Sequence, residues 1–296
     1  MALLTATDAK ITSSGIEGKL ETEAFGGLRD VVLQAGGIDL GLYKDKCVLR
    51  RITVRQRSSG TTSLRAYLKL VSRDPVERGR LVKALTIHVS QFFRNPSTFR
   101  AIQQDVLPTI LETKKAGGGR ALRLWSVGCA CGEEPYSLAI LLMEVSGHVV
   151  REFSTAIYAT DIDPDSLSRA REACYYGPSL ANVPAQWRQR HFMKDGEAYR
   201  VVPQVRRLVF FKGYNILNPA PFNRIDLVVC RNVLIYMTEA LQERVLVSLF
   251  EALNPGGYLV LGKVEGLTGE ARNLFEVTDI AERIYRKPGS RLSRQA

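Results

Sequence analysis

The chain has 296 residues, 45% of them hydrophobic, which is enough to bury one large core or two unequal ones. It carries 41 Lys and Arg against 30 Asp and Glu, and its formal net charge is +11. It contains no run of about 18 apolar residues, and its N-terminal residues lack the apolar core of a secretory signal. These properties argue against a membrane-spanning or secreted protein, so we expect a cytoplasmic one.

Five cysteines are present, an odd number: Cys47, Cys129, Cys131, Cys174 and Cys230. Zinc sites usually contain C-x-x-C pairs, whereas the close pair in this chain is spaced C-x-C. The pattern therefore favours free thiols in a reducing compartment, and we expect no metal site.

The positive charge is concentrated in one part of the chain. Residues 44–100 contain 14 Lys or Arg and three acids, Asp45, Asp74 and Glu77, an excess equal to that of the whole chain. A basic cluster accelerates encounter with an anionic partner. Nucleic acid, anionic lipid and an acidic protein all fit this charge, and so does a solvated helical surface without a partner.

The first part of the chain reads as helical. Residues 1–24 are polar and unpatterned, and we expect them to be disordered. Residues 25–98 show helical periodicity and predict a small all-α domain. Asp74-Pro75 is typical of a helix cap followed by a first-turn proline, and Asn95-Pro96 opens a further helix. A charged, glycine-rich linker at residues 114–119 then precedes a change of pattern.

From residue 99 to 288 we predict a single α/β domain. After the linker, short apolar runs alternate with helical stretches, beginning with a strand at Ala121–Val127 and a helix at Glu133–Val145. Such alternation indicates a parallel sheet wound on both faces. The segment FEVTDIAERIYRK is expected to add an antiparallel edge, and residues 289–296 to form a disordered tail.

The loop after the first strand is built of small residues, Gly128-Cys129-Ala130-Cys131-Gly132, and runs into Glu133 and Glu134. Small residues let the backbone approach a ligand closely. The loop matches neither G-x-G-x-x-G nor a phosphate loop, and two glutamates would repel a phosphate. They suit a ligand with positive charge, such as the amino group or sulfonium of S-adenosylmethionine. The alternative is that they only complement the helix dipole.

Polar residues end the following strands, where doubly wound sheets bind ligands. Asp161 can accept hydrogen bonds from ribose hydroxyls, whereas a helix cap fits Asp163 better. Asn215 can bond to an adenine edge or form a turn. The fourth strand delivers residues 230–236, CRNVLIY, to the same rim, where a methyl acceptor would meet the donor.

Five motifs in this order resemble the CheR family of chemotaxis receptor methyltransferases: SQFFRNPSTF, LRLWSVGCACGEEPYSLAILL, ATDIDPDSLSRARE, VVCRNVLIY and LNPGGYLVLG. The resemblance covers nearly all of residues 25–287. It implies a class I (Rossmann-like) methyltransferase domain behind a small all-α N-terminal domain. It also implies an inserted antiparallel β-subdomain, which we expect near residues 190–208.

The resemblance also implies which residues bind the donor: Ser90, Arg94, Gly128, Glu134, Asp161, Asn215, Ile216, Cys230 and Arg231. The chain departs from the family at two points. His88 and Ser90 stand where the family often has Asn and Thr; Ser90 keeps the hydroxyl, whereas a cofactor contact of His88 stays open. The C-x-C of the first loop replaces small hydroxyl residues, which matters little if the backbone makes the contact.

The implied activity is transfer of a methyl group from S-adenosylmethionine to glutamate side chains on the helical-bundle signalling region of transmembrane chemoreceptors, with S-adenosylhomocysteine as the second product. A glutamate with a pKa of about 4.3 is already ionised at pH 7, so the acceptor needs alignment rather than a general base. Arg94 would hold this carboxylate, and Tyr236 would donate to it or shape the pocket. The receptor is acidic and helical, which provides a partner for the basic domain.

Two further expectations concern association. The short loop at residues 194–199 is similar to that of family members that do not use a receptor C-terminal pentapeptide, so we expect independence of that peptide. We also expect a monomer that binds no nucleic acid and does not insert into a membrane.

Two other classes of protein are alternatives. An RNA methyltransferase would use the same fold, with the basic domain gripping phosphates. Amino-group methylation of bases commonly uses a proline-containing turn after the fourth strand, where this chain has Cys230-Arg231-Asn232-Val233. Attack at a pyrimidine carbon needs a nucleophilic cysteine, and Cys230 lacks the expected flanks. A non-catalytic cofactor sensor is the third class, and the intact Arg94 and Asp161 count against it.

Overall fold

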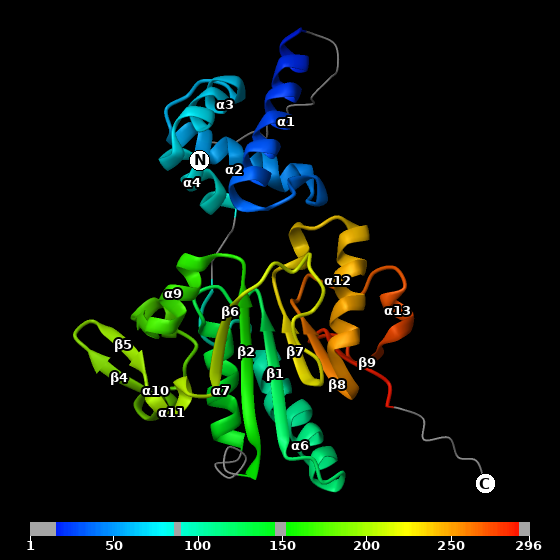
Figure 1. Cartoon of the computed structure of the whole chain (residues 1–296). Helices are drawn as coiled ribbons and strands as arrows, with labels where there is room; N and C mark the ends of the chain where they lie inside the picture. Colours follow the sequence, from blue (N-terminus) through cyan, green and yellow to red (C-terminus); the bar gives the residue numbers. More distant parts are fainter. Residues whose placement is uncertain (1–15, 86–89, 146–151, 290–296) are drawn as a thin grey trace, which may run out of the picture. The chain divides into compact units, whose positions relative to one another are not determined.

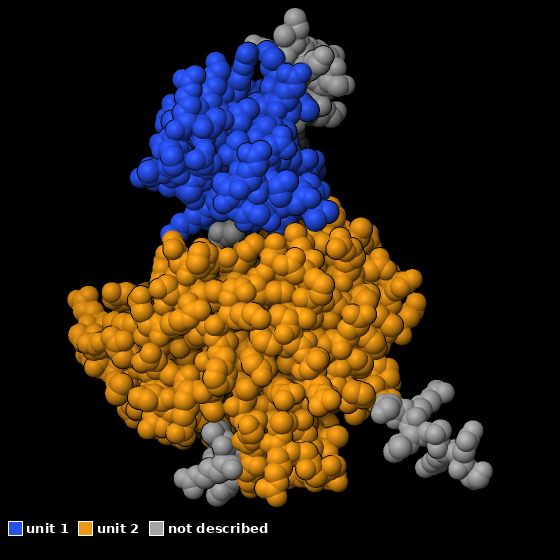
Figure 2. Space-filling view, viewed as in Figure 1, with its two compact units in different colours: residues 1–87 blue, residues 88–296 orange. Residues whose placement is uncertain are grey.

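A computed structural model of the chain describes residues 16–85, 90–145 and 152–289. The chain divides into two compact units, residues 1–87 and 88–296 (Figure 2). The expected boundary at residues 98 and 99 therefore lies too late. The reason is the segment before α5, whose Phe92 and Phe93 belong to the hydrophobic core of the second unit, together with Phe99 of α5 itself.

The first unit is all-α. Its elements are α1 (Ile16–Gly36), the short η1 (Leu40–Leu42), α2 (Asp45–Ser58), α3 (Leu64–Arg73) and α4 (Pro75–Leu85) (Figure 1). The expectation of disorder over residues 1–24 is wrong for residues 16–24, which are helical; residues 1–15 lie outside the described residues. Ala24, Leu28 and Val32 recur every four residues and are buried, so one apolar stripe holds this helix despite its polar composition.

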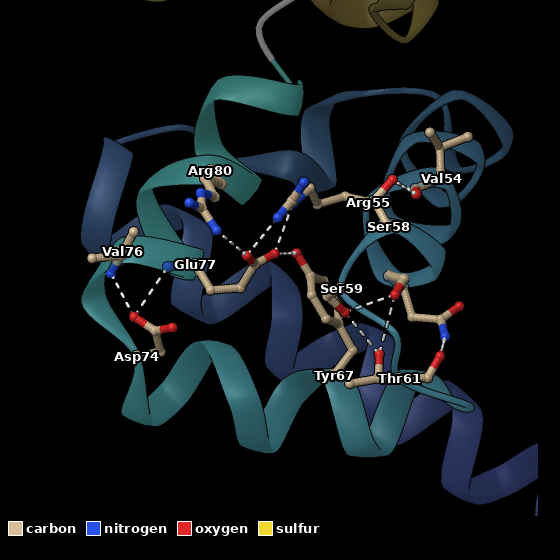
Figure 3. Close-up of polar contacts among 11 residues, drawn as sticks. Val54, Arg55, Ser58, Ser59, Thr61, Tyr67, Asp74, Val76, Glu77 and Arg80 are labelled. Carbon is tan, nitrogen blue, oxygen red and sulfur yellow. Dashed lines mark hydrogen bonds and ion pairs between the residues drawn. The ribbon is translucent and has the colours of Figure 1, made fainter.

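A buried carboxylate connects three of these helices. Asp74 caps α4 as expected, because its Oδ1 accepts hydrogen bonds from the N–H groups of Val76 at 2.8 Å and Glu77 at 3.2 Å. Glu77 is 3% exposed and accepts hydrogen bonds from Arg55 Nε at 2.7 Å, Arg55 Nη2 at 2.6 Å and the Tyr67 hydroxyl at 3.0 Å (Figure 3). The hydrogen bonds from Arg55 hold the pKa of Glu77 below its ordinary value of 4.5.

The second unit is built on a sheet of seven strands in the order β6-β2-β1-β7-β8-β10-β9 (Figure 1). The strands are β1 (Ala121–Val127), β2 (Ser154–Asp161), β6 (Val209–Gly213), β7 (Ile225–Cys230), β8 (Leu253–Leu261), β9 (Glu276–Asp279) and β10 (Ile284–Arg286). The first five in the sheet order are parallel, and β10 runs antiparallel to both β8 and β9. The predicted parallel sheet with an antiparallel edge is confirmed.

Helices cover both faces of this sheet, as in a class I methyltransferase fold (Figure 1). Within the described residues, the second unit has the helical elements α5 (Pro96–Ala101), η2 (Ile102–Val106), α6 (Leu107–Ala116), α7 (Glu133–Val145), α9 (Pro164–Glu172), η3 (Gly177–Leu180), α10 (Ala185–His191), α11 (Pro203–Arg206), η4 (Leu234–Tyr236), α12 (Glu239–Ala252) and α13 (Ala271–Leu274). None of the described helices in either unit is long and apolar enough to cross a membrane.

A second, smaller sheet is inserted between α9 and β6. It contains β3 (Cys174–Tyr176), β4 (Phe192–Asp195) and β5 (Ala198–Val201), all antiparallel, in the order β3-β5-β4. The expected insert at residues 190–208 therefore begins too late. Ala173, at φ +55°, ends α9, and β3 begins with the next residue.

Replacing Glu77 with Gln should destabilise the helical unit by about 2–3 kcal/mol at pH 7, because it leaves the Arg55 guanidinium without its buried partner. The folded pKa of Glu77 is depressed, so its stabilising contribution is complete above the unfolded value of 4.5 and is lost as pH falls through the folded pKa. Urea unfolding of the whole chain, followed by hydrogen exchange in α2 and α3 peptides, measures both effects. Equal stability of the two proteins at pH 7 would contradict this account.

Candidate functional site

The carboxyl ends of the parallel strands meet along one rim of the sheet. Val127, the last residue of β1, pairs with Thr160 of β2 and with Cys230 of β7, while Asp161 pairs with Gly213 of β6. The loops that follow these four strands therefore leave the sheet side by side. In doubly wound sheets this edge is where ligands bind. The structure brings four predicted site residues to this edge: Gly128, Asp161, Asn215 and Cys230.

The loop after β1 is held against both neighbouring strand ends. The N–H groups of Gly128 and Cys129 donate to the carbonyl of Thr160 at 2.8 and 2.9 Å. Gly128 has φ +70°, and a Cβ there would lie 2.5 Å from Cγ2 of Val233 in the chain after β7. Glycine is required at this position both by the backbone conformation and by the close approach.

The two aspartates after β2 have different roles. Asp163 caps α9 by accepting hydrogen bonds from the N–H group of Ser166 at 3.0 Å and from its hydroxyl at 2.7 Å, so the cap assignment is confirmed. Asp161 is 7% exposed, and its carboxylate accepts hydrogen bonds from the N–H groups of Ala130 at 2.8 Å and Asp163 at 2.9 Å. Its carboxylate is therefore held in a fixed orientation by the backbone of the loop after β1 and by its own strand end.

Glu133 and Glu134, at the start of α7, are largely shielded from solvent. Glu134 Oε1 accepts a hydrogen bond from the Ser126 hydroxyl at 2.8 Å, and burial raises the pKa of Glu134 even though Arg231 lies 3.3 Å from its Oε2. Burial also raises the pKa of Glu133, which hydrogen-bonds to Ser90. Oε2 of Glu133 is buried and has no hydrogen-bond partner among the described residues. Complementing a helix dipole does not require such burial, so this pair suits a cationic ligand.

Arg231 connects the rim to a segment more than a hundred residues earlier. Its side chain is 1% exposed, and Nη2 donates to the carbonyl of Arg94 and to Oδ1 of Asn95, each at 2.7 Å. The guanidinium also lies 5.4 Å from the ring centroid of Phe99. The Arg231 side chain, predicted to bind the donor, is thus engaged within the protein, where it fixes the turn that carries Arg94.

At the end of β6 the chain forms a tight turn. Oδ1 of Asn215 accepts a hydrogen bond from the N–H group of Leu217 at 3.0 Å, which confirms the turn-forming interpretation. This bond occupies the oxygen and leaves the amide NH2 as a donor. Ile216 lines a hollow of about 630 Å³ between this turn and α12, with Leu241 and Val245 on the opposite wall.

Tyr236 and His88 lie outside the contacts described so far. Tyr236 is the last residue of η4, in the chain that follows β7. His88 lies outside the described residues, so its contact with a ligand stays open. Glu265, which was not predicted from the sequence, accepts hydrogen bonds from backbone N–H groups at the start of η4, including Asn232 at 2.8 Å and Leu234 at 2.8 Å. A signal existed, because Glu265 lies in the short loop that follows the apolar strand β8, four residues after its last residue.

Together, the sheet order, the small-residue loop after β1, the acid after β2 and the buried glutamates of α7 define an S-adenosylmethionine-dependent methyltransferase of class I fold. Residues 88–284 match the model of the CheR methyltransferase SAM-binding domain, and residues 23–86 match that of the CheR methyltransferase all-alpha domain. The chain belongs to the CheR methyltransferase family. This result leaves the RNA methyltransferase alternative without support.

Several known proteins are similar in sequence to most of this chain. The chain is 33% identical over 241 residues to a chemotaxis protein methyltransferase of Listeria monocytogenes, covering 81% of this chain and 89% of that protein. It is 34% identical over 240 residues to chemotaxis protein methyltransferase 1 of Pseudomonas aeruginosa, covering 78% and 85%. It is also 32% identical over 285 residues to an uncharacterized 104.1 kDa protein of Rhodobacter capsulatus, of which it spans only 30%.

The residues at the rim fit S-adenosylmethionine. The unpartnered oxygen of Glu133 is suited to an ammonium or sulfonium charge, and the carboxylate of Asp161 is of the type that accepts hydrogen bonds from ribose hydroxyls. The NH2 group of Asn215 can donate to an acceptor nitrogen of adenine. The backbone of residues 128–132, stripped of large side chains, permits close approach of the methionine part.

Replacing Asp161 with Ala should weaken S-adenosylmethionine binding by roughly 10- to 150-fold, because a charged acceptor of hydroxyl hydrogen bonds is lost. Calorimetry on the folded variant measures the effect. Asp163→Ala is the matched control: it removes the cap of α9 two residues away and should change the affinity by less than about threefold, since capping costs fall on helix stability. Equal affinities for the wild type and Asp161→Ala, or equal losses in both variants, would remove Asp161 from the site.

Proposed function

We propose that this protein methylates glutamate side chains in the cytoplasmic signalling region of transmembrane chemoreceptors, giving glutamate methyl esters. The supporting observation is the hydrogen bond from the Arg231 side chain to the carbonyl of Arg94, which holds the backbone of Arg94 to the end of β7. Arg94 and Tyr236, far apart in sequence, are thereby carried by segments fixed to one rim. A cation and a phenol at that rim suit an anionic acceptor better than a neutral base or amine.

When bound, the cofactor supplies an activated methyl group on its sulfonium. The chain's own task is to orient the acceptor, because a glutamate carboxylate at pH 7 has no proton to lose. In this proposal the Arg94 guanidinium holds one oxygen of the carboxylate, and the Tyr236 hydroxyl donates to it or limits its movement. The buried Glu133 and Glu134 would hold the positively charged groups of S-adenosylmethionine at this rim.

The state of Cys230 favours this acceptor over a pyrimidine ring. Burial raises the pKa of the Cys230 thiol well above its ordinary value, and the charges of Glu265 and Glu134 add to the effect. A thiol in this environment stays protonated at neutral pH, whereas nucleophilic attack requires the thiolate. The rim therefore lacks the nucleophile that carbon methylation of RNA needs at this position.

The proposed receptor-docking surface is a row of exposed cations on α2: Lys46, Arg50 and Arg57. None of the three has an ion-pair partner within the parts of the chain that the structure describes. Arg51 and Arg55 are excluded from this surface, because Arg51 donates to the carbonyl of Leu85 and Arg55 is paired with Glu77. An acidic helical bundle is the complementary partner.

We place the reaction in the cytoplasm, where the receptor's signalling region lies, and propose that the enzyme acts as a monomer. Five free cysteines are compatible with a reducing compartment. The test of the proposed function is transfer of radiolabelled methyl from S-adenosylmethionine to purified receptor, followed by treatment with alkali. Label released as methanol supports a carboxyl ester, and label that resists alkali contradicts it.

Replacing Arg50 and Arg57 together with Gln should lower kcat/KM for receptor methylation by about tenfold at low ionic strength, with kcat nearly unchanged, because electrostatic steering acts on encounter. The difference should shrink as salt rises toward physiological strength, where the screening length is about 8 Å. The control is Arg207→Gln with Arg272→Gln, which removes the same charge from exposed sites of the second unit. Equal effects of the two double variants would show that only total charge matters.

The enzyme should show no measurable affinity for a free peptide from the receptor C-terminus. In the inserted sheet, β4 and β5 are joined by a two-residue turn, Gly196-Glu197, with Gly196 at φ +61°. Such a turn offers little backbone beyond the strands for holding a peptide. Deleting the receptor tail should therefore leave methylation nearly unchanged. Micromolar binding of a C-terminal pentapeptide in calorimetry, or loss of methylation on tail deletion, would contradict the proposal.

A further inference from the structure

One buried carboxylate has no part in the mechanism above. Glu265 follows β8 and is 6% exposed. Its Oε2 accepts hydrogen bonds from the N–H groups of Gly262 at 2.6 Å and Asn232 at 2.8 Å. Its Oε1 accepts those of Leu234 at 2.8 Å and Ile235 at 3.3 Å. Three of these four donors belong to the chain between β7 and α12, so a residue of one loop satisfies the backbone of another.

The turn after β7 has no capping group of its own. Val233, at the N-cap of η4, makes no side-chain cap hydrogen bond, and Asn232 has φ +60°. The first N–H groups of a helical turn have no acceptor within the turn, and leaving them buried without one is costly. The conformation of this turn therefore depends on the carboxylate of Glu265.

The approach of the two loops requires a glycine. A Cβ at Gly262 would lie 2.5 Å from Oε2 of Glu265 and 3.0 Å from the backbone nitrogen of Asn232. The missing side chain leaves room for the carboxylate to reach both loops. The loops after β7 and β8 are consequently connected through one side chain.

We propose that Glu265 is a positioning residue for methyl transfer. It acts through Tyr236, the last residue of η4, by fixing that turn to the loop after β8 and so setting where the phenol meets the incoming carboxylate. The assignment rests on the proposed function. A carboxylate is the suitable group, since both of its oxygens accept, whereas a glutamine would turn an NH2 group toward N–H donors.

Replacing Glu265 with Gln should lower kcat for receptor methylation about 10- to 100-fold, because a displacement of about 1 Å at a reacting group costs about 100-fold. The Kd for S-adenosylmethionine should change by less than about threefold. If Glu265 acts through Tyr236, the double variant with Tyr236→Phe is no slower than the slower single variant. Independent, multiplying losses in the double variant would overturn the assignment.

Asp226→Asn is the matched control. Asp226 is a buried carboxylate at the other end of β7, and it accepts hydrogen bonds from the N–H group of Arg123 at 2.9 Å and the Asn254 amide at 2.6 Å. This variant should lose thermal stability but keep its kcat per folded molecule. If Glu265→Gln behaves in the same way, with lower stability and unchanged kcat, the role of Glu265 is structural and the proposal is wrong.

Hydrogen exchange gives a readout that does not depend on activity. In Glu265→Gln the amides of Asn232, Leu234 and Ile235 should lose protection, while in Asp226→Asn they should keep it. Retained protection in Glu265→Gln overturns the inference even if the proposed function holds. Lost protection with a wild-type protein that methylates no receptor means instead that the proposed function fails, and the positioning role with it. Glu265→Asp, one methylene shorter, replaces the Gln variant if that variant does not fold.

Discussion

The burial of the Arg231 guanidinium at the end of β7 is the constraint on which the site depends. A charged group taken out of water is tolerated only when it is paired and hydrogen-bonded, and here Glu134 pairs with Nη1 while the carbonyl of Arg94 and Oδ1 of Asn95 accept from Nη2. Nε of Arg231 is buried without a partner among the described residues. Because these partners come from α7 and from the turn before α5, the second unit cannot bury this charge without also closing the turn onto the rim. Folding and assembly of the site are therefore one event.

The chain after β7 is held from two sides by opposite charges. The Arg231 side chain donates a hydrogen bond to Asn95. The carboxylate of Glu265 accepts hydrogen bonds from the backbone N–H groups of Asn232 and Leu234. Asn232 between them has φ +60°, a conformation that non-glycine residues seldom adopt without support. The rim is thus fixed by the protein itself, and cofactor binding does not have to supply the free energy of ordering it.

The sequence predicted those features that depend on local pattern. β1 and α7 have the expected bounds, because an apolar run, a small-residue loop and an apolar stretch of helical length follow one another in the sequence. The start of α1, the strand β3 and the role of Glu265 were not predicted. Each depends on a tertiary partner: the core that buries Ala24, the strand β5 that pairs with β3, and the backbone donors that Glu265 meets. For the candidate site, the sequence predicted that the site residues follow the ends of the strands. It did not predict that the Arg231 side chain bonds to other parts of the protein.

The first unit shows why net charge alone overstates a docking surface. Arg51 and Arg55 are four residues apart on α2 and point their charges into the protein, toward the carbonyl of Leu85 and toward Glu77. Arg50 and Arg57, seven residues apart, lie on the outer side of the same helix, since seven residues are close to two turns. The same residue type therefore serves stability on one face of α2 and remains available for encounter on the other. The helical period and the buried carboxylate of Glu77 in α4 determine which cations of α2 are exposed. Only these exposed cations attract an acidic partner.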